Sequence, residues 1–99
     1  MISSDLAELF SILGDPTRLR ILSMIREGET SVQILSENLG ISHSAVSHQL
    51  RLLRAHRLVQ NRRDGRNVLY TLDDQCIWDI LHAGESHLEH RHNGETNKV

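Results

Sequence analysis

Residues 32–55 restrict the possible fold more than any other part of the chain, because they predict two short helices separated by only three residues. Apolar residues recur at helical spacing from Val32 to Leu39, and Gly40 can end that helix. The break reads GIS, after which Ser42 can cap a second helix. Two short helices joined by so tight a turn have the spacing of a helix-turn-helix.

The second of these helices has an apolar stripe and an opposite polar face. Val46, Leu50 and Leu53 make the stripe. Small polar side chains stand in the first turns of the other face. A recognition helix needs such groups, because its N-terminal end enters the major groove and reads hydrogen-bond donors and acceptors there. An ordinary amphipathic surface helix would show the same pattern, so both interpretations remain open at this point. The candidate DNA-reading residues are His43, Ser44, Ser47, His48 and Arg51.

A basic β-hairpin is predicted directly after this helix. Residues 57–72 read RLVQNRRDGRNVLYTL, in which two strand-like runs flank the dipeptide DG. Joined to a helix-turn-helix, such a hairpin makes a winged helix-turn-helix, a fold that is mostly α with one β-hairpin. Arginines of the wing can contact the DNA backbone or the minor groove, which sets affinity and salt dependence. These candidates are Arg62, Arg63 and Arg66.

Two further helices are predicted before the helix-turn-helix. The first carries apolar residues at helical spacing, and Gly14 can end it in the left-handed conformation. Asp15 and Pro16 then supply an N-cap and a first helical residue for the second. Either Thr30 or Ser31 can cap the helix that follows.

The charge is distributed unevenly along the chain, although the formal net charge is only -2. Residues 51–66 hold six arginines and one acid, whereas residues 73–95 hold six acids and one arginine. This distribution suits a protein that contacts phosphates with its central segment and uses its C-terminal segment for a different function. A merely solvated basic hairpin is the alternative explanation.

The length of 99 residues predicts one domain, close to the size at which burying more surface in a dimer helps. We expect residues 1–92 to form the winged helix-turn-helix domain for DNA binding and dimerisation, and residues 93–99 to form a disordered tail. No apolar run approaches the roughly 20 residues of a membrane span, and the N-terminus lacks a signal-peptide pattern. We therefore expect a cytoplasmic protein that does not enter a membrane.

Potential metal ligands stand at opposite ends of the last predicted helix. Asp74 and Cys76, the only cysteine, are at its start, and His87 and His90 are near its end. At about 1.5 Å per residue, Asp74 and His87 would lie roughly 20 Å apart along the axis. A single chain therefore cannot bring the two ends to one ion.

Three segments together resemble one family. The stretches LGDPTRLRIL, ISHSAVSHQLRLLR and RRDGRNVLYTLDD are similar to those of the ArsR/SmtB family of winged-helix transcriptional repressors, and the similarity covers about residues 5–90. The resemblance implies a homodimer on double-stranded operator DNA with an inverted repeat. It also implies an inducer, commonly a metal ion, whose binding weakens DNA binding.

The resemblance also implies where a metal would bind. Zinc and cobalt sensors of this family place Asp-x-His at the start of the last helix and His-x-x-His or His-x-x-Glu near its end. This chain has Asp74-x-Cys76 and His87-x-x-His90, so it departs by one cysteine. If the last helices of two subunits cross antiparallel about a two-fold axis, each divalent ion takes two ligands from each chain. These donors suit Zn²⁺ best, with Co²⁺, Cd²⁺ or Ni²⁺ as further candidates.

Other interpretations stay open beside this one. His82 or His92 could join the metal site. An oxidant could be the inducer, with Cys76 as the sensor, although the acidic residues around it disfavour a thiolate. A DNA-binding protein without an inducer is a third possibility. We expect no enzyme, since neither a glycine-rich phosphate loop nor a nucleophile elbow accompanies the cysteine.

Overall fold

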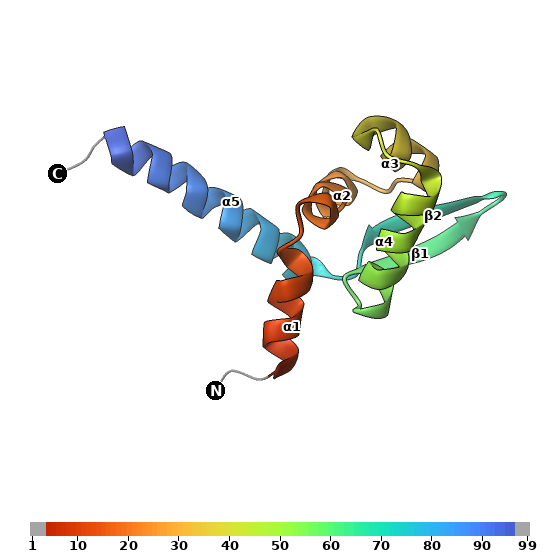
Figure 1. The fold of residues 1–99 in the computed structure, drawn as a ribbon, viewed down its shortest axis with the longest axis horizontal. Helices are drawn as coiled ribbons and strands as arrows, with labels where there is room; N and C mark the ends of the chain where they lie inside the picture. Colours follow the sequence, from red (N-terminus) through yellow and green to blue (C-terminus); the bar gives the residue numbers. More distant parts are fainter. Residues whose placement is uncertain (1–3, 97–99) are drawn as a thin grey trace.

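A computed structural model describes residues 4–96, with side chains described as far as residue 91. The fold is mostly α with one antiparallel β-hairpin, as predicted, and it is a winged helix-turn-helix. In Figure 1, helices α2 to α4 and the hairpin form the body, from which α1 and α5 project in different directions. The elements are α1 (Ser4–Leu13), α2 (Pro16–Glu27), α3 (Val32–Leu39), α4 (His43–Ala55), β1 (Val59–Asp64), β2 (Asn67–Leu72) and α5 (Gln75–Thr96).

Most predicted helix ends are confirmed by their capping contacts. The Asp15 side chain accepts a hydrogen bond from the Arg18 backbone N–H at the start of α2. Ser31, rather than Thr30, caps α3. Gly40 ends α3 in the left-handed conformation with φ 68°, where a side chain would add strain.

The end of α1 differs from the prediction. Gly14 is not among the described residues with positive φ, so it does not adopt the left-handed conformation. Its N–H donates to the Ser11 carbonyl at 3.2 Å, which closes the helix with a tighter turn. With α2 capped at Asp15, the chain has room for only one residue between α1 and that cap.

The last helix extends beyond the domain boundary that was predicted at residue 92. Helix α5 continues to Thr96, so residues 93–96 of the predicted tail are helical, and residues 97–99 lie outside the described part. The only proline of the chain is Pro16, so no proline interrupts this helix.

A single apolar core holds α4 against the hairpin. It joins the inner faces of α2, α3 and α4 to the residues at the base of β1, and the first turns of α5 complete it. This packing holds α4 and the base of the hairpin together. The buried apolar residues are Leu13, Ile21, Leu22, Ile25, Leu35, Val46, Leu50, Leu53, Leu58, Val59, Ile77 and Leu81.

The hairpin, called the wing below, turns one residue later than the DG dipeptide suggested. Asp64 still pairs with Asn67 as the last pair of the ladder, so Gly65 and Arg66 are the two central turn residues. Gly65 has φ 64°, as the first position of a type II′ turn requires. At the other end, Thr30 forms two backbone hydrogen bonds with β2, which attach the wing to the α2–α3 loop.

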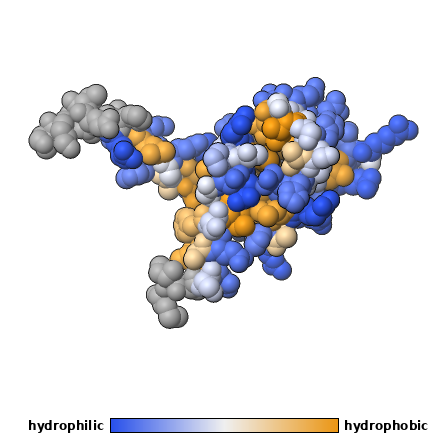
Figure 2. Space-filling view, viewed as in Figure 1, coloured by the Kyte–Doolittle hydropathy of each residue, from blue (hydrophilic) through white to orange (hydrophobic). Residues whose placement is uncertain are grey.

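Apolar side chains remain exposed where α1 and α5 leave the body. Phe10 is 54% exposed and Leu88 is 51% exposed, and both belong to one contiguous apolar surface. Figure 2 shows hydrophobic surface gathered at this junction. The residues line a groove of about 420 Å³, called the apolar groove below: Phe10, Leu13, Gly14, Leu19, Ser23, Ile80, Leu81, Gly84, Glu85 and Leu88.

Within residues 4–96, no helix combines the length and the hydrophobicity that a membrane span needs.

Candidate functional site

Helix α4 presents the predicted polar face to solvent. Ser42 caps the helix by accepting a hydrogen bond from the Ala45 N–H at 3.0 Å, and the apolar stripe is buried. His43, Ser44, His48 and Arg51 are exposed, and Ser47 is half-buried. The first turns of α4 therefore carry accessible donors and acceptors on a rigidly packed helix.

A polar groove of about 580 Å³ separates α4 from the wing. Ser47, Arg51 and Arg54 line it from α4, and Tyr70 lines it from β2. The sequence-based prediction missed Arg54, although its position three residues after Arg51 puts both on one helical face. Two guanidinium groups along one groove make it a basic channel between helix and wing.

The three arginines of the wing are not equivalent. All of them are exposed, and no ion pair among the described residues involves Arg63 or Arg66. Arg62, in contrast, donates from Nε to Glu29 Oε2 at 2.6 Å and from Nη2 to Glu29 Oε1 at 2.8 Å. The hydrogen bonds with Arg62 hold the pKa of Glu29 below its ordinary value and raise the pKa of Arg62.

At the start of α5, Asp74 acts as a capping residue. Its Oδ1 accepts a hydrogen bond from the Ile77 backbone N–H at 3.2 Å. Cys76 lies in the first turn and is exposed as a free thiol. Since the cap uses one carboxylate oxygen, the other oxygen and the thiol are available on the surface at this end of the helix.

Near the other end of α5, His87 and His90 are exposed and share one helical face by their spacing. No group of three or more potential ligands occurs among the residues that the structure describes. The separation expected from the sequence is therefore present in the folded chain. His82 stacks on Trp78, with ring centroids 4.8 Å apart, and the side chain of His92 lies outside the described ones.

The donors at the two ends of α5 fit a metal ion if two chains contribute. Carboxylate, thiolate and imidazole groups form a tetrahedral set that zinc accepts, and all four side chains reach solvent in the single chain. Each end supplies only two of them, which is too few to close a structural zinc site.

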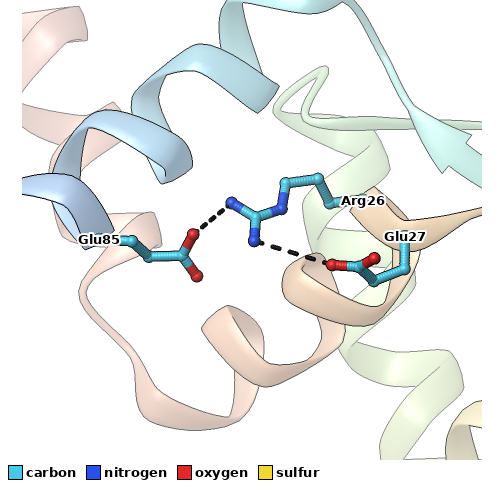
Figure 3. A network of polar contacts seen from close by, with 3 residues as sticks. All are labelled: Arg26, Glu27 and Glu85. Atoms are coloured by element: carbon cyan, nitrogen blue, oxygen red, sulfur yellow. Dashed lines mark hydrogen bonds and ion pairs between the residues drawn. The ribbon is translucent and has the colours of Figure 1, made fainter.

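A network around Arg26 connects α5 to α2 (Figure 3). Arg26 Nη1 lies 2.6 Å from Glu85 Oε1, and its Nη2 lies 3.9 Å from Glu27. The guanidinium carbon also lies 5.6 Å from the ring centroid of Trp78. No sequence pattern indicated this contact, because its partners are far apart along the chain.

Comparison with known proteins gives a consistent result. A family model described as bacterial regulatory protein, arsR family, matches residues 15–61, from the N-cap of α2 into β1. The transcriptional repressor SmtB homolog of Synechocystis is 45% identical over 87 residues, which cover 88% of this chain and 66% of that protein. The chain thus spans just under two thirds of that relative's length.

Two proteins of Mycobacterium tuberculosis are similar over more of their own length. The HTH-type transcriptional regulator NmtR is 40% identical over 92 residues, covering 93% of this chain and 77% of that protein. The crystal structure of Rv0081 superposes with a TM-score of 0.83 at 32% identity and covers 91% of both chains. The sequence and the fold of this chain are therefore both similar to those of HTH-type transcriptional regulators.

Proposed function

The chain belongs to the arsR family of bacterial regulatory proteins, and on that premise we propose that it is a metal-responsive transcriptional repressor. Its homodimer binds double-stranded operator DNA in the cytoplasm. It releases the DNA when a divalent metal ion binds between two α5 helices, and zinc is the first candidate for this ion. Members of this family regulate transcription and are not enzymes.

The DNA-binding surface consists of the polar face of α4 and the wing. Exposed polar groups in the first turns of α4 read base edges in the major groove. Arg63 and Arg66, which have no ion-pair partner among the described residues, contact phosphates beside it. The residues on α4 are His43, Ser44, Ser47, His48 and Arg51.

The apolar groove between α1 and α5 is the proposed dimer interface. It leaves Phe10 and Leu88 about half exposed in the single chain, and a second copy would cover them. A two-fold axis through this region would place the start of one α5 beside the end of the other. Asp74 and Cys76 of one chain would then meet His87 and His90 of its partner.

The observation that carries the metal proposal is the division of these four donors between the two ends of one exposed helix. Bound metal supplies a cross-link between subunits, so it favours one quaternary arrangement over others. Such a preference shifts DNA affinity only if the arrangements differ in their fit to DNA. A coupling free energy of about 1–3 kcal/mol, or roughly 5–150-fold in affinity, is typical.

A metal titration of the DNA-bound protein tests the proposal. Duplexes enriched from a random-sequence library by the purified protein serve as probes, and fluorescence anisotropy follows their release. Zinc should release the DNA, a chelator should restore the complex, and His87→Ala should keep DNA binding but lose the zinc response. An enriched sequence without two-fold symmetry would contradict the homodimer.

The same titration separates the alternatives. If Zn²⁺, Co²⁺, Cd²⁺ and Ni²⁺ all leave DNA affinity unchanged, the metal response is wrong. Release by an oxidant that a thiol reductant reverses, and that Cys76→Ser abolishes, would identify Cys76 as a redox sensor instead.

A further inference from the structure

Arg62 and Arg63 lie on opposite faces of the hairpin. Successive residues of a strand alternate between the two faces of a sheet. Val59 of β1 is buried in the core, so Arg63, an even number of positions further on, shares the face that looks toward α4. Arg62 lies on the outer face, away from α4.

On that outer face, Arg62 crosses β2 to reach the α2–α3 loop. The Thr30 N–H donates to the Tyr70 carbonyl at 3.2 Å, and the Tyr70 N–H donates to the Thr30 carbonyl at 2.7 Å. The loop therefore adjoins the edge of β2 that β1 leaves free. Glu29 immediately precedes Thr30 and is therefore held beside the sheet. Its two carboxylate oxygens receive the Nε and Nη2 donors of Arg62, a paired geometry that adds specificity as well as strength.

An isolated two-stranded hairpin is only marginally stable in water, so the wing depends on what holds its base. The Thr30 bridge attaches β2 alone, whereas the bond between Glu29 and Arg62 attaches β1. Together they tie both strands to the same short loop. The Glu29 carboxylate occupies the Nε and Nη2 donors of Arg62 and offsets its charge, so this arginine attracts a DNA phosphate less than an arginine without such a partner.

We propose that Glu29 is a positioning residue for the wing and that Arg62 is its anchor rather than a phosphate contact. This rests on the proposed DNA-binding function and refines it. The pair sets the angle of the hairpin to α4, and Arg63 and Arg66 make the wing's phosphate contacts. Of the three arginines predicted to touch DNA, Arg62 thus acts indirectly.

Salt dependence of DNA binding distinguishes an anchor from a phosphate contact. Removing one phosphate contact lowers the slope of log affinity against log salt by about 0.9. On a mixed-sequence DNA duplex, Arg63→Gln should lower the slope by this amount. Arg62→Gln, which removes the same charge, should weaken binding with the slope unchanged. The exchange Glu29→Arg with Arg62→Glu keeps the net charge and restores the pair, so it should recover most of the affinity that Arg62→Gln loses.

Amide hydrogen exchange of the free protein tests the anchor without DNA. Arg62→Gln and Glu29→Gln should each speed exchange at the Thr30 and Tyr70 amides, and the double variant should add little to either. Arg63→Gln, the matched control, should leave both rates unchanged.

Two results would overturn the proposal. Unchanged exchange in both Arg62→Gln and Glu29→Gln would show that the pair anchors nothing. A slope that falls in Arg62→Gln as it does in Arg63→Gln would make Arg62 a phosphate contact. If the unaltered protein bound no duplex at all, the proposed function would fail, and the exchange rates would still decide the anchor.

Discussion

Arg26 Nη1 lies 2.6 Å from Glu85 Oε1, although the two residues are 59 positions apart in the sequence. The Arg26 side chain is only 13% exposed, and its guanidinium also lies over the Trp78 ring. Since Trp78 and Glu85 are about two turns apart on α5, one side chain of α2 holds this helix at two points. Arg26 therefore helps to set the direction in which α5 leaves the body, together with the core residues Ile77 and Leu81.

Replacing Arg26 should therefore loosen α5. Arg26→Ala should lower the free energy of unfolding by about 1–2 kcal/mol, because it removes a nearly buried cation over an aromatic ring together with its ion pair. Urea denaturation with linear extrapolation measures the change. Arg26→Lys keeps the charge but loses the planar stacking, so it should recover only part of the stability. Equal stability of Arg26→Ala and the unaltered protein would contradict this role.

Leu88→Glu should dissociate the proposed dimer without unfolding the chain. Leu88 is half exposed in the single chain and lines the apolar groove, so a charge there is costly only when a second copy covers it. Leu81, which also lines the groove, is buried in the chain's own core and is a poorer probe. Sedimentation measures the change, with Ile34→Glu on α3, at a similarly exposed apolar residue, as the control. An unchanged dimer would move the interface elsewhere.

Base reading and phosphate binding should depend on different residues. Ser47→Ala or His48→Ala should weaken binding to the enriched duplex more than to a mixed-sequence duplex, by about 1–3 kcal/mol for each base that the variant no longer reads. Arg66→Ala should weaken both duplexes alike and lower the salt slope by about 0.9. Competition binding at several salt concentrations measures both effects. Equal weakening on both duplexes for the α4 variants would remove α4 from the base-reading surface.

Cobalt spectroscopy tests the proposed ligand Cys76. A thiolate bound to Co²⁺ gives a charge-transfer absorption, which Cys76→Ser should abolish while it also weakens zinc binding. His82→Asn serves as the control, because His82 stacks on Trp78 and is not among the four proposed ligands. Full zinc affinity and an unchanged cobalt spectrum in Cys76→Ser would require a different donor.

The pKa of Glu29 should report the bond to Arg62. Hydrogen bonding by Arg62 lowers this pKa from the ordinary value, so the pair's contribution to stability is complete above the ordinary carboxyl pKa. It is lost as the pH falls through the lowered value. Arg62→Gln should raise the pKa of Glu29, which carboxyl NMR titration measures directly. Asp64→Asn is the control for the other charge that acts on Arg62, and it should change the Glu29 titration little.

Local sequence signals determined the helix ends and the general fold. Asp15 with Pro16 and Ser42 mark helix starts in the structure as they do in the sequence, and Gly40 marks an end. Capping depends on hydrogen bonds within about one turn, so the residues that decide it are neighbours in the chain. The separation of Asp74 from His87 is local in the same sense, because a continuous helix sets it.

The partners of the charged side chains were decided only by the tertiary structure. Strand alternation alone separates Arg62 from Arg63, but Glu29 is 33 residues from Arg62, and Arg26 is still further from Glu85. Gly14 also differed from expectation, because the immediate start of α2 at Asp15 shaped the turn more than glycine's own freedom did. Pairings of this kind depend on where the packed core brings distant segments together, and periodicity and capping within one segment carry no information about that.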